Sequence, residues 1–164
     1  MKIRLLSILL GLLLCMNLMP MTVLAASVPD DLTFDISEGS VIVEDGSETG
    51  KVKITYGEGQ MLDNVDPRQE MTVTGSTTNT GNEVQIKTNI PLRIAIQDLY
   101  MDKRTMNIDS GNSGCGTICL NYTDAADVTL VLKGDNKLIA GWDKAGISVP
   151  AGARLTIEGE GSLY

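Results

Sequence analysis

One strand-like phrase occurs twice near the end of the chain, and this repeat constrains the fold more than any other feature. The segment VTLVLKG at 128–134 is similar to RLTIEG at 154–159, which begins about 26 residues later. Each copy alternates apolar and polar residues, which is the period of a half-buried β-strand. Between the copies, AGISV at 145–149 alternates in the same way, and PAG at 150–152 indicates a turn. Short strands that recur at one spacing predict a repeat architecture.

We therefore expect an all-β fold, a right-handed parallel β-helix (β-solenoid) of about five coils. A single coil cannot bury its own apolar face, so stacked coils would share one continuous core. The coils are expected to begin near Val52, Met71, Leu92, Val128 and Arg154. The expected inward columns are Ile94, Leu130 and Leu155, followed by Ile96, Leu132 and Ile157.

The segment from Leu92 to Ser110 allows two interpretations. It contains neither Gly nor Pro, and Pro91 could occupy the first turn of a helix. Apolar residues at alternate positions from Leu92 to Ile96 favour a strand instead. The residues from Lys103 to Gly114 would then bulge out as a loop. Further strands are expected within 34–43, 52–56, 71–74, 84–87 and 117–122, with a loop over 57–68.

The N-terminus has the pattern of a secretory signal. Lys2 and Arg4 precede an apolar run at 5–14, and small residues suit cleavage after Ala25 or Ala26. We therefore expect a secreted, cell-surface-associated protein. The expected division is a signal peptide at 1–26, an N-terminal cap or leader strands at 27–50, and the β-helix at 51–164.

Two alternatives to cleavage remain open. A retained membrane anchor would need about 20 apolar residues, but Asn17 and Pro20 interrupt the run. Cys15 would be the acceptor in a lipoprotein signal, although Leu14 stands where such a signal has a small residue.

The charge balance and the missing histidines exclude several classes of function. The chain has 13 Lys+Arg against 21 Asp+Glu, a net charge of −8. This charge argues against nucleic acid or an anionic membrane as the main partner. No histidine is present, which removes the commonest general base and metal ligand near neutral pH. Zinc chemistry and Ser-His-Asp or Cys-His catalysis are therefore not expected.

Two cysteines, Cys115 and Cys119, follow the signal segment. On one extended strand their α-carbons would be about 13 Å apart, which is too far for a disulfide. If Gly114 and Gly116 fold the chain back, a bond becomes possible. The composition favours two small buried side chains.

Three longer phrases resemble a known family. VTLVLKGDNKL, AGISVPAGARLTIEGEGSL and MTVTGSTTNTGNEVQI are similar to secreted surface proteins of Gram-positive anaerobes with a pectin-lyase-like β-helix, often labelled carbohydrate-binding-domain-containing. The resemblance covers roughly 55–164 and implies an extracellular β-helix. In that family further glycine-rich coils usually follow, so the chain is expected to be part of a longer protein or truncated in its last coil. Such an uncovered coil predicts end-to-end self-association or aggregation.

Polar residues one position after the inward column provide the first candidates for a site. Gln97, Lys133 and Glu158 are expected to form an outer ladder with a Lys133–Glu158 ion pair. Three acids of the following turn are expected near one another: Asp98, Asp135 and Glu160. They are either solvated or bridged by calcium, a scheme that resembles pectate lyases, with Arg93 or Lys137 as the available bases. A second acidic loop contains Asp63, Asn64 and Asp66.

Trp142, the only tryptophan, is the predicted ligand-binding residue. An exposed indole can stack on the C–H face of a sugar, although the ring can equally cover the core edge. Tyr100 and Tyr122 are weaker candidates of the same kind. We expect a non-catalytic module that binds polysaccharide or acts as a surface spacer. The alternatives are a polysaccharide lyase or glycoside hydrolase on the same coil, and a protein-binding adhesin.

Overall fold

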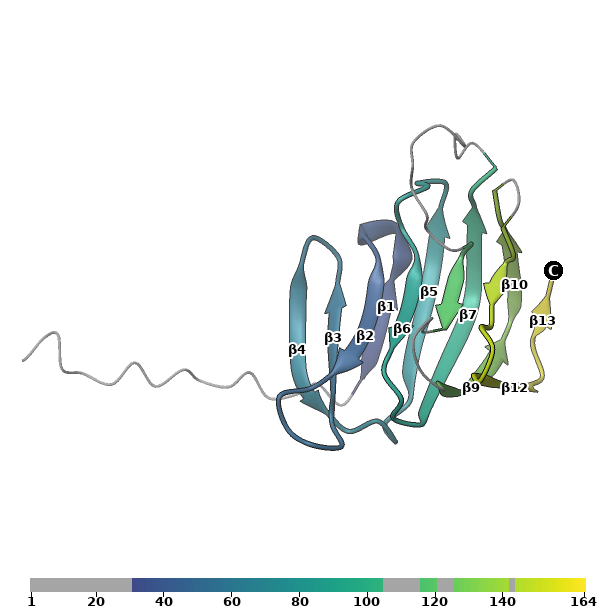
Figure 1. The fold of residues 1–164 in the computed structure, drawn as a ribbon. Coiled ribbons are helices and arrows are strands. Elements are labelled where there is room, and N and C mark those ends of the chain that lie inside the picture. Colours follow the sequence, from purple (N-terminus) through teal and green to yellow (C-terminus); the bar gives the residue numbers. More distant parts are fainter. Residues whose placement is uncertain (1–30, 105–115, 121–125, 142–143) are drawn as a thin grey trace, which may run out of the picture.

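The computed structural model contains two β-sheets and describes residues 31–104, 116–120, 126–141 and 144–164 (Figure 1). Within these ranges the only helix is a short 3-10 turn, η1 (Ile36–Glu38). The described ranges also include no helix with the length and apolarity needed to cross a membrane. The expectation of an all-β fold is therefore confirmed.

The first sheet has seven strands, and all its strand pairs are parallel. β5 lies between β1 and the long strand β7, which pairs with β9 along its first part and with β10 along its second. β12 then pairs with β9, and β13 with β10. The bounds are β1 Leu32–Asp35, β5 Met71–Thr77, β7 Leu92–Asp102, β9 Asp127–Lys133, β10 Asp135–Ile139, β12 Arg154–Gly159 and β13 Ser162–Leu163.

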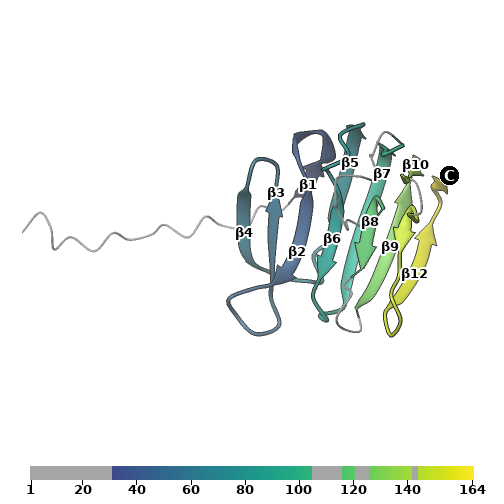
Figure 2. The same cartoon turned by 45° about the horizontal axis from the view of Figure 1, so that its top comes forward.

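The second sheet has six strands in the order β11-β8-β6-β2-β3-β4. The pairs from β11 to β2 are parallel, whereas β2-β3 and β3-β4 are antiparallel. β3 and β4 extend this sheet on one side of β2. From β5 onward the chain visits the two sheets in turn, and both sheets grow in the opposite direction, toward β11 and β12 (Figure 2). The bounds are β2 Val41–Asp45, β3 Val52–Tyr56, β4 Gln60–Val65, β6 Val84–Lys87, β8 Ile118–Leu120 and β11 Ile147–Ser148.

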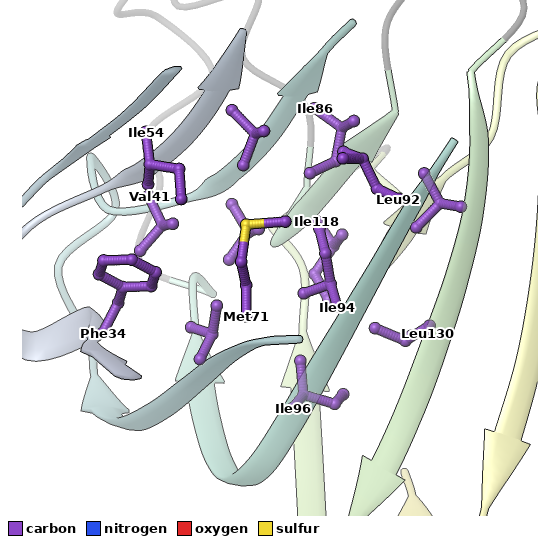
Figure 3. Close-up of a cluster of buried hydrophobic side chains, with 14 of the residues drawn as sticks. Phe34, Val41, Ile54, Met71, Ile86, Leu92, Ile94, Ile96, Ile118 and Leu130 are labelled. Carbon is purple, nitrogen blue, oxygen red and sulfur yellow. The ribbon is translucent and has the colours of Figure 1, made fainter. Parts of the chain in front are cut away.

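The apolar core lies between the sheets, because alternate side chains of each strand point inward (Figure 3). Met71 of the first sheet and Ile86 of the second are both buried in it. At one end Phe34 packs against Tyr56, with ring centroids 4.9 Å apart. Burying one such large apolar side chain contributes about 1.5–3 kcal/mol to the free energy of unfolding.

The strand interpretation of Leu92–Ile96 is confirmed, because these residues begin β7. The expected strands at 52–56, 71–74 and 84–87 are also present. The segment 34–43, in which strands were expected, overlaps two strands, β1 and β2. The predicted loop at 57–68 is wrong in its middle part, which forms β4. Asn64 has a left-handed φ of 60° and the β3–β4 register shifts between Val52 and Ile54, so β4 lacks regular alternation.

The strand that precedes Met71 in the first sheet is also different from the prediction. We expected Val52 to begin the neighbouring coil, but Leu32 lies opposite Met71. Val52 instead pairs antiparallel within the second sheet, opposite Asp45 on one side and Val65 on the other. Sequence alternation predicts that a strand exists, but it does not determine which strand lies beside it.

The inward columns are confirmed for Ile94 with Leu130 and for Ile96 with Leu132. The prediction for β12 is wrong by two residues, because Leu155 lies opposite Val128 and Ile157 opposite Leu130. A two-residue shift keeps the same side chains facing inward. Gly159 therefore lies opposite Leu132, where a β-carbon would be 2.4 Å from the Leu132 carbonyl oxygen.

Candidate functional site

A polar hollow of about 440 Å³ lies on the outer face of the first sheet. Neighbouring strands supply its walls, since Thr74 lies opposite Gln97 and Gln97 opposite Lys133. The inward neighbours of these residues, such as Val73 and Ile96, are buried, so the strand period itself sends the polar side chains outward. The lining residues are Asp31, Leu32, Thr33, Glu70, Thr72, Thr74, Gln97 and Lys133.

Glu70 connects the charged groups beside this hollow. One carboxylate oxygen accepts a hydrogen bond of 2.6 Å from Lys133 Nζ, and the other lies 3.3 Å from Arg93 Nε. Arg93 also pairs with Glu158 through Nη1. The hydrogen bond and charge of Lys133, followed by the hydrogen bond and charge of Arg93, lower the pKa of Glu70, so this carboxylate is ionised at neutral pH. Partly exposed ion pairs of this kind each contribute about 0.2–1 kcal/mol.

The predicted Lys133–Glu158 pair is wrong. Gln97 and Lys133 do lie opposite each other, but Glu158 lies opposite Val131 because of the β12 register. Lys133 binds Glu70 instead, and Glu158 binds Arg93. The sequence did not lead us to predict a role for Glu70. The one feature that could have indicated it is its position immediately before the alternating strand that begins at Met71.

Two of the three turn acids, Asp98 and Asp135, accept hydrogen bonds from neighbouring strands. Asp98 Oδ1 accepts a hydrogen bond of 3.0 Å from the Asp135 backbone N–H, and Asp135 Oδ1 accepts one of 2.6 Å from Ser162 Oγ. These carboxylates therefore stabilise the bends between strands, while Glu160 is exposed. No group of three His, Cys, Asp or Glu residues suited to a metal occurs in the described part of the chain.

The second acidic group organises a hairpin and is not a free loop. Asp63 Oδ1 accepts a hydrogen bond of 3.0 Å from the Ser47 N–H, and Asn64 Oδ1 accepts one of 2.9 Å from the Glu48 N–H. Asp66 pairs with Arg68 at 2.8 Å. Hydrogen bonds from these partners lower the pKa of Asp63 and Asp66.

Lys103 is the most unusual ionisable group among the described residues. The prediction placed it on an exposed bulge, but its side chain is buried and its backbone N–H donates to Ile139 O at 2.8 Å. Its Nζ has no hydrogen-bond partner and lies 3.8 Å from Glu83 Oε2. Burial lowers the pKa of Lys103, and the nearby Glu83 charge opposes that effect.

Several predicted residues lie outside the described ranges, namely Trp142, Tyr122 and Cys115. Tyr100 is half-buried, and its hydroxyl donates to Asp102 at 3.2 Å. Cys119 is buried as expected but is disulfide-bonded, so the favoured interpretation of two reduced cysteines is wrong for this residue.

The chain matches no protein-family model, no curated protein and no solved structure.

Proposed function

We propose that the chain is a secreted or cell-surface, non-catalytic module that binds polysaccharide in the hollow of the first sheet. The observation that carries this proposal is the row of outward polar side chains, Thr74, Gln97 and Lys133, contributed by three adjacent strands. Adjacent strands are about 4.8 Å apart, so the row offers hydrogen-bonding groups at regular intervals. An extended chain of sugars presents its hydroxyl groups in a comparable series.

The chemistry of the lining suits a hydroxyl-rich ligand. Threonine hydroxyls and the Gln97 amide both donate and accept hydrogen bonds, Lys133 only donates, and the Glu70 carboxylate only accepts. The hollow of about 440 Å³ lies within the size range of ligand sites. Its polar lining favours a sugar over an apolar ligand.

We propose for the whole chain that the two sheets are faces of a right-handed parallel β-helix. The support is the alternation of the chain between the sheets from β5 onward, where every added strand pairs in parallel with a strand of an earlier visit. Such a rod would hold the polar row straight along its length.

The carboxyl groups support a binding role over a catalytic one. A glycoside hydrolase needs one carboxylic acid with a raised pKa to protonate the leaving oxygen. Every displaced carboxyl pKa among the described residues is lowered, as at Glu70 and Asp102. Hydrogen bonds are the main cause: Arg or Lys donates them to Asp66, Glu70 and Asp102, and Ser47 donates them to Asp63.

The test is binding of the purified chain to an array of plant and bacterial cell-wall polysaccharides. Thr74→Val and Gln97→Leu remove hydrogen-bonding groups with little change of shape, and each is expected to weaken binding about tenfold. Matched controls on the outer face of the second sheet are Thr55→Val and Gln85→Leu, which should leave binding unchanged. Equal effects of both pairs would exclude the hollow as the site. The predicted contact at Trp142 is tested by Trp142→Phe in the same assay.

Other outcomes distinguish the alternative functions. Release of sugar products that is lost in Asp135→Ala would overturn the non-catalytic assignment. Attachment to cells or matrix that free sugars do not compete with would indicate an adhesin. Mass spectrometry of chain recovered from the culture medium tests export, with Ala26 or Ser27 expected as the first residue.

A further inference from the structure

The free side of β12 exposes hydrogen-bonding groups of the backbone. Among the described residues β12 pairs only with β9, and the Arg154 N–H donates to Ala126 O at 2.7 Å. In a parallel strand the N–H and C=O of one residue point to the same neighbour, and successive residues alternate between neighbours. Because Arg154 points toward β9, Leu155 and Ile157 point their backbone groups to the free side.

The same edge exposes apolar surface that belongs to the core. In the row formed by Ile94, Leu130 and Ile157, the first two side chains are 3% and 2% exposed, but Ile157 is 48% exposed. At the opposite end of the core Val52 and Ile54 are fully buried. Among the described residues, three of the four exposed large apolar side chains lie at the β12 end, namely Val149, Ile157 and Tyr164, and the fourth, Met61, lies on β4 at the opposite end. Contact between two β12 ends therefore brings together more exposed apolar side chains than head-to-tail contact.

We propose that two copies of this chain pair through β12 in antiparallel orientation, with a two-fold axis beside Thr156. In this register Leu155 lies opposite the partner's Ile157, so apolar side chains meet on the inner face. The outward-pointing backbone groups of these residues form four hydrogen bonds between the copies. Thr156 lies opposite the partner's Thr156 as a non-hydrogen-bonded pair.

Charge complementarity selects this register. It places Arg154 opposite the partner's Glu158, and the two-fold axis repeats that pair. Arg154 already binds Asp127 at 2.9 Å, and Glu158 binds Arg93. Negative and positive side chains therefore alternate across the interface. Asp127 and Arg154 of one copy are followed by Glu158 and Arg93 of the other. A two-fold axis beside Leu155 or Ile157 would also keep apolar residues together, but it would not oppose these charges within β12.

Cross-linking tests the predicted register. In a non-hydrogen-bonded antiparallel pair the α-carbons are about 4.5 Å apart, within the range that a disulfide spans. Under mild oxidation Thr156→Cys is expected to give a covalent dimer on non-reducing gels. The matched control is Thr129→Cys, since Thr129 lies opposite Thr156 within one copy and away from the interface. No dimer from Thr156→Cys, or equal dimer from both variants, would overturn the register.

Sedimentation velocity over a range of concentrations tests the association itself. The wild-type chain is expected to show a monomer–dimer equilibrium, and Ile157→Pro should weaken it about tenfold because each copy loses one donor at the interface. Ile157 does not donate to β9, so the fold should persist, as checked by circular dichroism. Thr156→Val provides a second variant that leaves the backbone donors intact and should still dimerise. A wild-type chain that stays monomeric, or one that grows into open polymers, contradicts the proposal.

Discussion

At the scale of single residues, Lys103 shows how long-range packing overrides local sequence. A lysine after Asp102 at the end of a strand looks like the beginning of an exposed turn. Its backbone instead continues the ladder to Ile139, which draws the side chain inside beside Glu83. Burying an ammonium group without a hydrogen bond has a cost that only a neighbouring charge can offset.

Replacing Lys103 with Met tests that cost. We expect Lys103→Met to raise the free energy of unfolding at neutral pH, because Met keeps the volume and removes a charge whose burial the Glu83 ion pair offsets only in part. The pKa of Lys103 is lower in the folded state than the ordinary 10.5. The unfolded chain therefore binds more protons between the two values, so wild-type stability should rise with pH across that window.

Urea unfolding of both proteins at a series of pH values checks this expectation. The advantage of Lys103→Met should shrink as the pH approaches 10.5. Lys87→Met, at a more exposed lysine that also lies near a carboxylate, is the control and should show no such trend. A variant that is less stable than wild type at neutral pH would show that the Glu83 ion pair outweighs burial.

At the scale of elements, Gly159 fixes the register of β12. Its φ is 103°, and a β-carbon there would be 2.4 Å from Leu132 O. Gly152 has a similar φ of 92° but nothing within 4 Å of such an atom. Gly159→Ala is therefore expected to cost about 1–2 kcal/mol more than Gly152→Ala, because both incur backbone strain but only the first creates a clash. Denaturant unfolding of the two variants measures the difference, and equal losses would contradict this role.

The strands themselves were largely predictable, because alternation is a local property. Val52–Tyr56 and Val84–Lys87 alternate cleanly, and both are strands with the expected bounds. Pairing was less predictable, because the partner of Met71 is Leu32, from a segment expected to be a cap. The candidate site was predictable to the same extent. The outward positions of Gln97 and Lys133 follow from strand alternation, which is local. The ion pairs of Glu70 with Arg93 and Lys133 join residues far apart in the sequence, so no local pattern predicts them.

At the scale of the whole molecule, the free energy of unfolding depends on pH through four carboxyl groups. The pKa values of Asp63, Asp66, Glu70 and Asp102 are all lower in the folded chain than their ordinary values, mainly through hydrogen bonds from their partners. A lowered folded pKa gives stability that is present above the ordinary value and is lost as the pH falls through the folded one. The free energy of unfolding should therefore decrease below the ordinary values of 3.8 for Asp and 4.5 for Glu.

Glu70→Gln isolates the share of this acid effect that belongs to the candidate site. The variant keeps the shape of Glu70 but cannot form ion pairs with Lys133 and Arg93, so it should be less stable than wild type near neutral pH. Its loss of stability on acidification should be smaller, because one group with a lowered pKa is gone. Unfolding by urea at several acidic pH values measures both effects, and Glu38→Gln on the exposed η1 turn is the control. If Glu70→Gln and wild type lost stability in parallel, Glu70 would not be the residue that connects the charges of the first sheet.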